Sequence, residues 1–315
     1  MTKKKVVLVL AAVFGVAVIA LGVHFGVNAY LDSQISYRVQ DTLPNGQGKK
    51  VKVIFLAGQS NASGCSLDAY LKHNVAPEKY AEYETSYDNV YINYFVSGNN
   101  ISNAFVKCGV RQGENGNCFG PELGLAEKLH ALYPDEMFFI IKWAWGGTDL
   151  HTKWLSPSSR GKTGKLYKHF EAFAETSLDY LSSKNYDVEV VGMCWMQGES
   201  DAISVANATD YRERLNNFIK DVRQKFGCCA APDGIAFIDA AIAQNPALWV
   251  YCDLVNQSKQ AVAAQSPLNV LIDTNAEGLI CTEEPEQKPD TAHYDSMSQI
   301  KLGNLFGEEL AKFIK

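Results

Sequence analysis

Two features that would indicate a metal site or a repeat protein are missing from the sequence. It contains no CxxC pair, no cysteine–histidine spacing of the kind that binds zinc, and no internal repeat. We therefore expect no zinc site. With 47% hydrophobic and 20% charged residues, the composition also argues against a disordered or fibrous chain and favours a globular protein.

Positive charge is scarce outside the extreme N-terminus. The chain has 29 lysines and arginines against 35 aspartates and glutamates, and no acidic residue precedes Asp32. Without Lys3–Lys5 the body keeps 26 basic and 35 acidic residues and a net charge of −9. Phosphate backbones and anionic lipid headgroups repel a body this acidic, so we expect neither nucleic acid nor an anionic membrane surface as its partner.

The N-terminus carries the one long apolar run. Val6–Val23 contains no charged residue, and about 18 apolar residues suffice to cross a bilayer. Lys3–Lys5 favour a cytosolic N-terminus with the body on the other side of the membrane. We expect residues 1–29 to form a single-pass signal-anchor, with a cleaved signal peptide and secretion as the alternative. Residues 30–50 are predicted to be a linker and residues 51–315 one domain.

The eight cysteines are compatible with an exported protein. Cys194 lies within an apolar run and is expected to be a buried thiol. Cys108 and Cys118 flank a loop rich in glycine and asparagine, which a disulfide could close in an oxidising compartment.

Strand and helix patterns alternate along the body. Strands are predicted at 51–57, 137–145, 188–196, 235–242 and 269–273, and helices at 119–132, 166–183, 208–226, 251–265 and 296–315. This alternation predicts an α/β fold, a three-layer α/β/α sandwich around a central parallel sheet. Residues 64–118 are polar and aromatic, and we expect them to form a loop-rich insertion.

Polar groups suited to catalysis follow several of these strands. Ser60 follows the first strand, Gly146 and Gly147 the second, Gln197 and Glu199 the third, and an Asp-Thr-Ala-His segment precedes the last helix. Ligands of open α/β sheets bind beyond the carboxyl ends of the strands. Taken alone, Ser60 is more typical of a helix N-cap. A serine, a histidine, an acid and free amides at one sheet edge are the groups needed for nucleophilic acyl transfer.

Five segments in this order resemble the SGNH hydrolase superfamily: GQSN, FGPE, GGT, WMQGESD and DTAHY. The similarity is greatest to its sialate O-acetylesterase-like branch, which includes the acetylxylan esterases of carbohydrate esterase family 6, and it covers about residues 51–315. It implies a flavodoxin-like sandwich that hydrolyses O-acetyl esters of carbohydrates, either acetylated polysaccharide or sialic acid, without a metal or organic cofactor. The G-x-S-x-G elbow of other α/β-hydrolases is absent around Ser60.

The resemblance also implies roles for individual residues. Ser60 matches the nucleophile, His293 the general base and Asp290 the acid that orients the imidazole. The Ser60 amide, an amide of the Gly146–Gly147 turn and the Gln197 side chain are expected to stabilise the oxyanion.

Four further residues are expected to support this site. Gln59 and Asn61 flank the serine, and Asn61 is expected to stabilise the turn behind it. Glu199 is either a second acid for His293 or a structural carboxylate, and we favour the structural role. Glu122 is expected to be a structural carboxylate near the start of its helix.

Two other functions remain as alternatives. One is a short-chain lipase or thioesterase on the same fold, which would need a long apolar groove that the sequence does not reveal. The other is a non-catalytic carbohydrate-binding surface protein, which would be expected to have lost Ser60, Asp290 or His293.

Overall fold

The computed structural model describes residues 36–97 and 100–315. The chain divides into two units, and the second, Arg38–Lys315, contains nearly all of the described residues. The signal-anchor predicted for residues 1–29 lies outside them. Across the described ranges, no helix combines the length and the apolar character needed to cross a bilayer.

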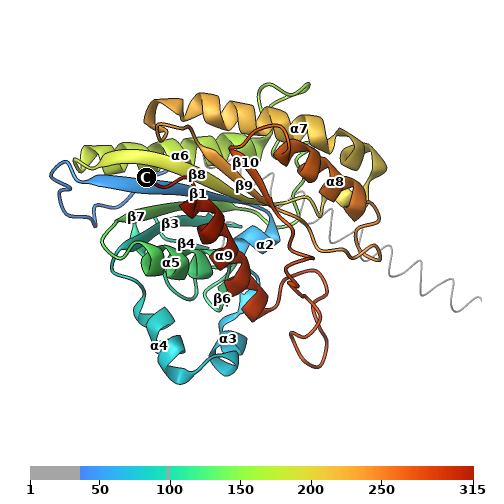
Figure 1. The fold of residues 1–315 in the computed structure, drawn as a ribbon, viewed down its shortest axis with the longest axis horizontal. Coiled ribbons are helices and arrows are strands. Elements are labelled where there is room, and N and C mark those ends of the chain that lie inside the picture. The colour runs from blue at the N-terminus through green and yellow to red at the C-terminus, as the bar shows by residue number, and fades with distance from the viewer. Residues whose placement is uncertain (1–35, 98–99) are drawn as a thin grey trace, which may run out of the picture. The chain divides into compact units, whose positions relative to one another are not determined.

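A mostly parallel sheet runs through the second unit (Figure 1). Its order is β10-β9-β8-β1-β7-β3-β4, and β5 pairs with β3. The six parallel strands are β1 (Lys50–Gly58), β3 (Val90–Val96), β7 (Phe138–Ala144), β8 (Asp187–Met196), β9 (Ala236–Ala240) and β10 (Asn269–Ile272). The central strands are buried along nearly their whole length, because helices cover both faces and every side chain meets a packed layer.

Helices form the two outer layers. Figure 1 shows α6 (Lys165–Ser183), α7 (Val205–Lys225) and α8 (Cys252–Ala263) on one side of the sheet, with α5 (Pro121–Leu132) and α9 (Ser296–Ala311) on the other. This arrangement confirms the predicted three-layer α/β class.

Aromatic packing joins the sheet to the first helical layer. Phe55 of β1 meets Phe170 of α6 edge to face, with ring centroids 5.6 Å apart, and it also meets Phe226 at 4.8 Å. All three rings are buried.

Two glycines let the helices of the other layer approach closely. A Cβ on Gly124 of α5 would lie 2.0 Å from the carbonyl oxygen of Ile300, and one on Gly303 of α9 would lie 2.1 Å from that of Pro121. The backbones therefore touch where any larger residue would separate them. The short distance between α5 and α9 fixes the helix that follows the predicted Asp290–His293 loop.

The prediction of a loop-rich insertion at residues 64–118 is wrong. This segment holds α3 (Asp68–Asn74), α4 (Pro77–Thr85) and the parallel strand β3. Asn93 interrupts the apolar pattern of β3. The side chain is nevertheless buried, because it is hydrogen-bonded to Ser177 and Ser102. The remaining short elements are α2 (Ser60–Ser63), β2 (Ser66–Leu67), β4 (Asn100–Ile101), β5 (Val106–Lys107), β6 (Cys118–Phe119), η1 (Asp201–Ile203) and η2 (Gly227–Cys229).

The end of the segment expected to be a linker contacts the body. The backbone N–H groups of Thr42 and Leu43 both donate to the Tyr180 hydroxyl at 3.0 Å, and the Leu43 side chain is buried. The chain therefore packs against α6 several residues before β1 begins.

The cysteines differ in part from expectation. Cys194 is a buried thiol, as predicted. Cys108 and Cys118 do not form the suggested disulfide and are both buried free thiols. The Cys108 thiol instead donates to the carbonyl oxygen of Glu122 at 3.4 Å.

Candidate active site

Ser60 lies where β1 ends and α2 begins. Gly58, the last residue of β1, has a φ of +143°, and a Cβ there would lie 2.0 Å from the carbonyl oxygen of Met196 in β8. Only glycine fits this conformation and this close approach. The chain then turns sharply, which places Ser60 at the first position of α2, 9% exposed, at the carboxyl edge of the sheet.

His293 and Asp290 form a pair in the loop before α9. The Nδ1 atom of His293 lies 2.6 Å from Oδ2 of Asp290, and the Ala292 N–H donates to the other carboxylate oxygen at 3.0 Å. The hydrogen bond to His293 holds the pKa of Asp290 below its ordinary value. Burial lowers the pKa of His293, but Asp290, together with the charges of Glu199 and Glu114, outweighs it and raises that pKa above its ordinary value.

Asn61 connects the serine turn to the histidine loop. Its Oδ1 accepts the Tyr294 N–H at 3.0 Å, and its Nδ2 donates to the Ala292 carbonyl oxygen at 3.3 Å. Both neighbours of His293 are thus held by the residue that follows Ser60. No direct Ser60–His293 hydrogen bond is present in the described residues, so Asn61 is the contact that brings the two halves of the site together.

Glu199 is a buried carboxylate behind this connection. It is 2% exposed, and its Oε1 accepts a hydrogen bond from Asn61 Nδ2 at 2.8 Å. Its Oε2 has no hydrogen-bond partner among the described residues. Burial raises the pKa of Glu199, although the Asn61 bond and the positive charges of Lys259 and His293 oppose the shift. Glu199 thus contacts the residue that follows Ser60, and its structural role stays a prediction.

The geometry does not support the expected oxyanion role of Gln197. Its side chain has no exposed surface, and its Nε2 donates to Asp201 at 2.6 Å, to the Thr148 carbonyl oxygen at 3.0 Å and to Gln59 at 3.3 Å. Its Oε1 accepts from Tyr211 at 3.1 Å. The amide is fully committed within the protein, and it joins the ends of β1, β7 and β8.

Gln59 and Asp201 complete this buried network. The Oε1 atom of Gln59 also accepts the N–H groups of Gly198 at 3.4 Å and Ser200 at 3.3 Å. Asp201 accepts the N–H of Leu150 at 2.8 Å, and burial raises the pKa of its carboxyl to about 7. Gln59 therefore supports the loops around the serine without facing the cavity.

Backbone amides beside Ser60 are better placed to stabilise an oxyanion. A Cβ on Gly146 would lie 3.4 Å from Ser60 Cβ, so the glycine turn borders the serine directly. The Gly146 N–H donates to Ser97 Oγ at 3.3 Å. Gly147 is exposed with a φ of +66°, and within the described residues neither its amide nor that of Ser60 has an acceptor.

A buried ion pair contacts the end of the short helix α2, which begins at Ser60. Lys142 of β7 and Glu122 of α5 are both completely buried, with Nζ and Oε2 2.6 Å apart. Lys142 also donates to the carbonyl oxygens of Ser63 at 2.8 Å and Gln112 at 3.0 Å. One ammonium group thereby fixes α2 and the loop before β6, and Glu122 has the structural position that we expected.

Two residues at the site have no signal in the sequence. The Glu114 side chain approaches the serine turn, with Oε1 3.6 Å from the position of a Cβ on Gly146. Its Oε2 accepts from the Cys65 thiol at 3.2 Å. Burial and the Glu114 charge raise the pKa of that thiol, which makes it a poor nucleophile.

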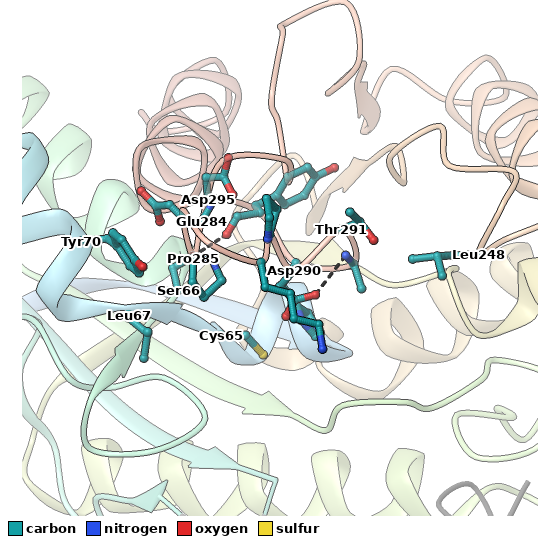
Figure 2. A pocket seen from close by; sticks show the side chains of 15 residues that line it. Cys65, Ser66, Leu67, Tyr70, Leu248, Glu284, Pro285, Asp290, Thr291 and Asp295 are labelled. Atoms are coloured by element: carbon teal, nitrogen blue, oxygen red, sulfur yellow. Dashed lines mark hydrogen bonds and ion pairs between the residues drawn. The ribbon is translucent and has the colours of Figure 1, made fainter. Parts of the chain in front are cut away.

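A cavity of about 580 Å³ opens beside His293. Its lining includes Cys65, Tyr70 and Leu248 together with the Asp290–His293 loop, and Figure 2 shows Tyr70 and Leu248 on opposite sides of Asp290. A volume of this size accommodates a small organic ligand. Among the described residues, no three histidine, cysteine or acidic side chains are grouped so as to hold a metal ion.

Comparison with known families identifies one match. The family model described as "Carbohydrate esterase, sialic acid-specific acetylesterase" matches residues 50–312. No curated protein sequence shows significant similarity to the chain.

Solved structures share the fold at low sequence identity. NanS superposes with a TM-score of 0.64 at 15% identity, covering 85% of this chain and 98% of its own. A protein from Arabidopsis thaliana gives a TM-score of 0.60 at 18% identity, covering 86% of this chain and 100% of its own. A carbohydrate acetylesterase from Xanthomonas citri gives 0.56 at 16% identity, covering 83% of this chain and 56% of its own.

Proposed function

The chain belongs to the carbohydrate esterase family of sialic acid-specific acetylesterases, and from this premise we propose that it hydrolyses O-acetyl esters of carbohydrates with Ser60 as the nucleophile. One observation carries the assignment of residues. His293 and Asp290 are paired at 2.6 Å in a loop whose backbone, on both sides of His293, is hydrogen-bonded to the residue after Ser60.

The proposed reaction has two half-reactions. His293 Nε2 accepts the proton of the Ser60 hydroxyl while the serine oxygen attacks the acetyl carbonyl carbon. The tetrahedral intermediate collapses, the sugar hydroxyl leaves with the proton from His293, and an acetyl-serine remains. Water then attacks this ester with His293 again as the base, and acetate leaves. Asp290 keeps the Nδ1–H of the imidazole directed toward itself and stabilises the charged form.

Backbone amides are the proposed oxyanion donors. The N–H groups of Ser60 and Gly147 have no acceptor among the described residues, the glycine turn borders Ser60, and backbone amides cannot titrate. Gln197 supports these donors indirectly, since its contacts with Thr148 and Asp201 hold the glycine turn against the end of β8. The cavity beside His293 is the proposed place for the sugar that carries the acetyl group.

We also propose that the enzyme is held at a membrane with its esterase domain on the extracytoplasmic side. The uncharged run Val6–Val23 and the preceding Lys3–Lys5 support this orientation. Cleavage of the segment would release the same domain as a secreted enzyme.

The test compares Ser60→Ala with a matched control in the same short helix. Ser63→Ala removes a buried hydroxyl that has no hydrogen-bond partner among the described residues, so it should change little. Acetate release is measured from an aryl acetate, acetylated xylan and acetylated sialic acid. Ser60→Ala should lose several orders of magnitude in turnover on every substrate that the wild type cleaves. Near-wild-type turnover in Ser60→Ala would remove Ser60 from the mechanism.

A further inference from the structure

A carboxylate without a cationic partner stands at the proposed nucleophile. Glu114 Oε1 lies 3.6 Å from the Cβ position of Gly146, the glycine that borders Ser60. Among the described residues, the Cys65 thiol at 3.2 Å is the one side-chain hydrogen-bond partner of Glu114, and no lysine or arginine lies within ion-pair distance of it. The side chain is partly buried, which leaves its charge less screened than that of a surface acid.

The loop that closes the site adds negative charge. Between Cys281 and His293 it carries four acidic residues and one basic residue, Lys288: the acids are Glu283, Glu284, Glu286 and Asp290. Lys288 lines the cavity but is solvent-exposed. Glu199 lies behind the same loop, and its charge acts on His293.

The buried cations near the site are already neutralised. Lys142 is bound to Glu122, and Lys259 to Asp239, each at 2.6 Å. Neither ammonium group is exposed, so neither can meet a substrate carboxylate.

The cavity lining contains three carboxylates, Glu284, Asp290 and Asp295, and a single lysine, Lys288. Glu114 lies next to this lining, since it accepts a hydrogen bond from Cys65, which is part of it.

We propose that Glu114 is a specificity-determining residue, which accepts hydrogen bonds from the hydroxyls of a neutral acetylated sugar and disfavours an anionic one such as sialic acid. Sugar hydroxyls are donors that a carboxylate binds well, whereas a second carboxylate at the same place is repelled. This inference rests on the proposed esterase function and narrows its substrate class to uncharged O-acetylated carbohydrates.

A matched pair of substrates isolates the charge. 9-O-acetyl sialic acid and its methyl ester carry the same acetyl group, and only the first is anionic. Acetate release from both, and from an O-acetylated methyl xyloside, is measured with the full chain and with two variants, Glu114→Gln and Glu78→Gln. Glu78 is an exposed acid of α4 without an ion pair among the described residues, so its variant controls for net charge.

The wild type should favour the methyl ester over the free acid by about tenfold or more in kcat/KM, and rising salt should narrow that ratio. At low salt, Glu114→Gln should reduce the ratio of kcat/KM between methyl ester and free acid by about fivefold. With the xyloside, the same variant should raise KM more than it lowers kcat. Glu78→Gln should keep the wild-type ratio. Calorimetry with Ser60→Ala, which binds without turnover, should show the same preference for the methyl ester.

The outcomes separate the two proposals. If the wild type releases acetate neither from these substrates nor from an aryl acetate, the esterase function itself is overturned. An active enzyme that cleaves the free acid as well as its methyl ester overturns only the neutral-substrate inference. A preference that is the same in Glu114→Gln as in the wild type removes Glu114 as its origin.

Discussion

The side-chain amide of Asn61 lies 2.8 Å from one oxygen of Glu199, and the other oxygen of that buried carboxylate has no partner among the described residues. The same asparagine holds the backbone of Tyr294. A buried acid thus orients the residue that joins the serine turn to the histidine loop, and neither side chain has to touch the substrate to affect the reaction.

Replacing Asn61 should therefore affect stability and activity together. In Asn61→Ala, Glu199 loses its remaining side-chain partner, which should cost about 1–3 kcal/mol in the free energy of unfolding. The His293 loop also loses its attachment, so kcat should fall with little change in KM. Urea unfolding and aryl acetate kinetics measure the two effects. Adding Glu199→Gln, which removes the buried charge, should recover stability but not kcat; recovery of both would contradict a positioning role.

The three acids and bases of the site should rank in a fixed order. His293→Ala should be as damaging as Ser60→Ala, because the two side chains act as one unit. Asp290→Asn should be clearly damaging, and Glu199→Gln milder, since Asp290, unlike Glu199, is hydrogen-bonded to the imidazole. Values of kcat/KM on an aryl acetate give the ranking. A larger loss for Glu199→Gln than for Asp290→Asn would make Glu199 the principal acid.

Gln197→Ala should lower stability as well as turnover. Without the amide, the Thr148 carbonyl oxygen loses a buried donor, and Asp201 and Tyr211 each lose one of their hydrogen bonds. A buried group left unsatisfied costs about 1–3 kcal/mol. The exposed Gln224→Ala is the control for glutamine removal. A large loss in kcat with an unchanged urea midpoint would instead place the Gln197 amide at the oxyanion.

The rate should depend on pH through His293. His293 must be neutral to act as the general base, so kcat/KM should rise as the pH increases through the pKa of His293. Because that pKa lies above its ordinary value of 6.5, the midpoint of this acid limb should lie above pH 6.5. Asp290→Asn removes the main group that raises this pKa, and the limb should move to lower pH. A pH–rate profile on a neutral aryl acetate tests this, and an unmoved limb would assign the titration to another group.

His293 and Asp290 also make folding stability depend on pH, one at the alkaline side and the other at the acidic side. The raised pKa of His293 contributes stability that is fully present below about 6.5 and is lost as the pH rises through the folded-state value. The lowered pKa of Asp290 contributes stability present above about 3.8 and lost as the pH falls through its folded-state value. Urea midpoints of the wild type and Asp290→Asn across this range should converge at both extremes.

The N-terminal segment allows a test independent of the esterase chemistry. Full-length protein should sediment with membranes and resist carbonate extraction, because Val6–Val23 is long enough to cross the hydrocarbon core. A shortened protein that begins at Ser33 should be soluble and equally active. Native protein recovered in soluble form with a mature N-terminus near Tyr30 would mean cleavage instead of anchoring.

Most of the fold follows from short-range patterns in the sequence. Five of the six parallel strands are mostly apolar segments, although β7 contains Lys142 and β9 contains Asp239, and burial on both faces makes the central ones conspicuous. β3 was missed because it lies within the longer polar and aromatic segment 64–118, and Asn93 stands at its centre. The reason is tertiary: Asn93 is satisfied by Ser177, which is 84 residues away along the chain.

The site, like the fold, contains residues that the sequence predicts from local spacing and residues that depend on contacts with distant parts of the chain. Asp290 and His293 are three residues apart, so local geometry brings them together as their spacing predicts. The direction of the Gln197 side chain depends on Asp201 and on the Gly147 turn, about 50 residues away, and no local pattern encodes it. Glu114 lies in a loop without periodicity, and only the folded chain brings it to Ser60.

The Lys142–Glu122 pair has a consequence for motion. Its ammonium group holds the carbonyl of Ser63 in α2 and that of Gln112, two residues before Glu114. Opening either segment leaves a charge in the dry interior with fewer partners, so both should open only together. Amide hydrogen exchange around Ser60 and around Glu114 should then share one opening free energy, and mutation of Lys142 should accelerate exchange in both segments equally.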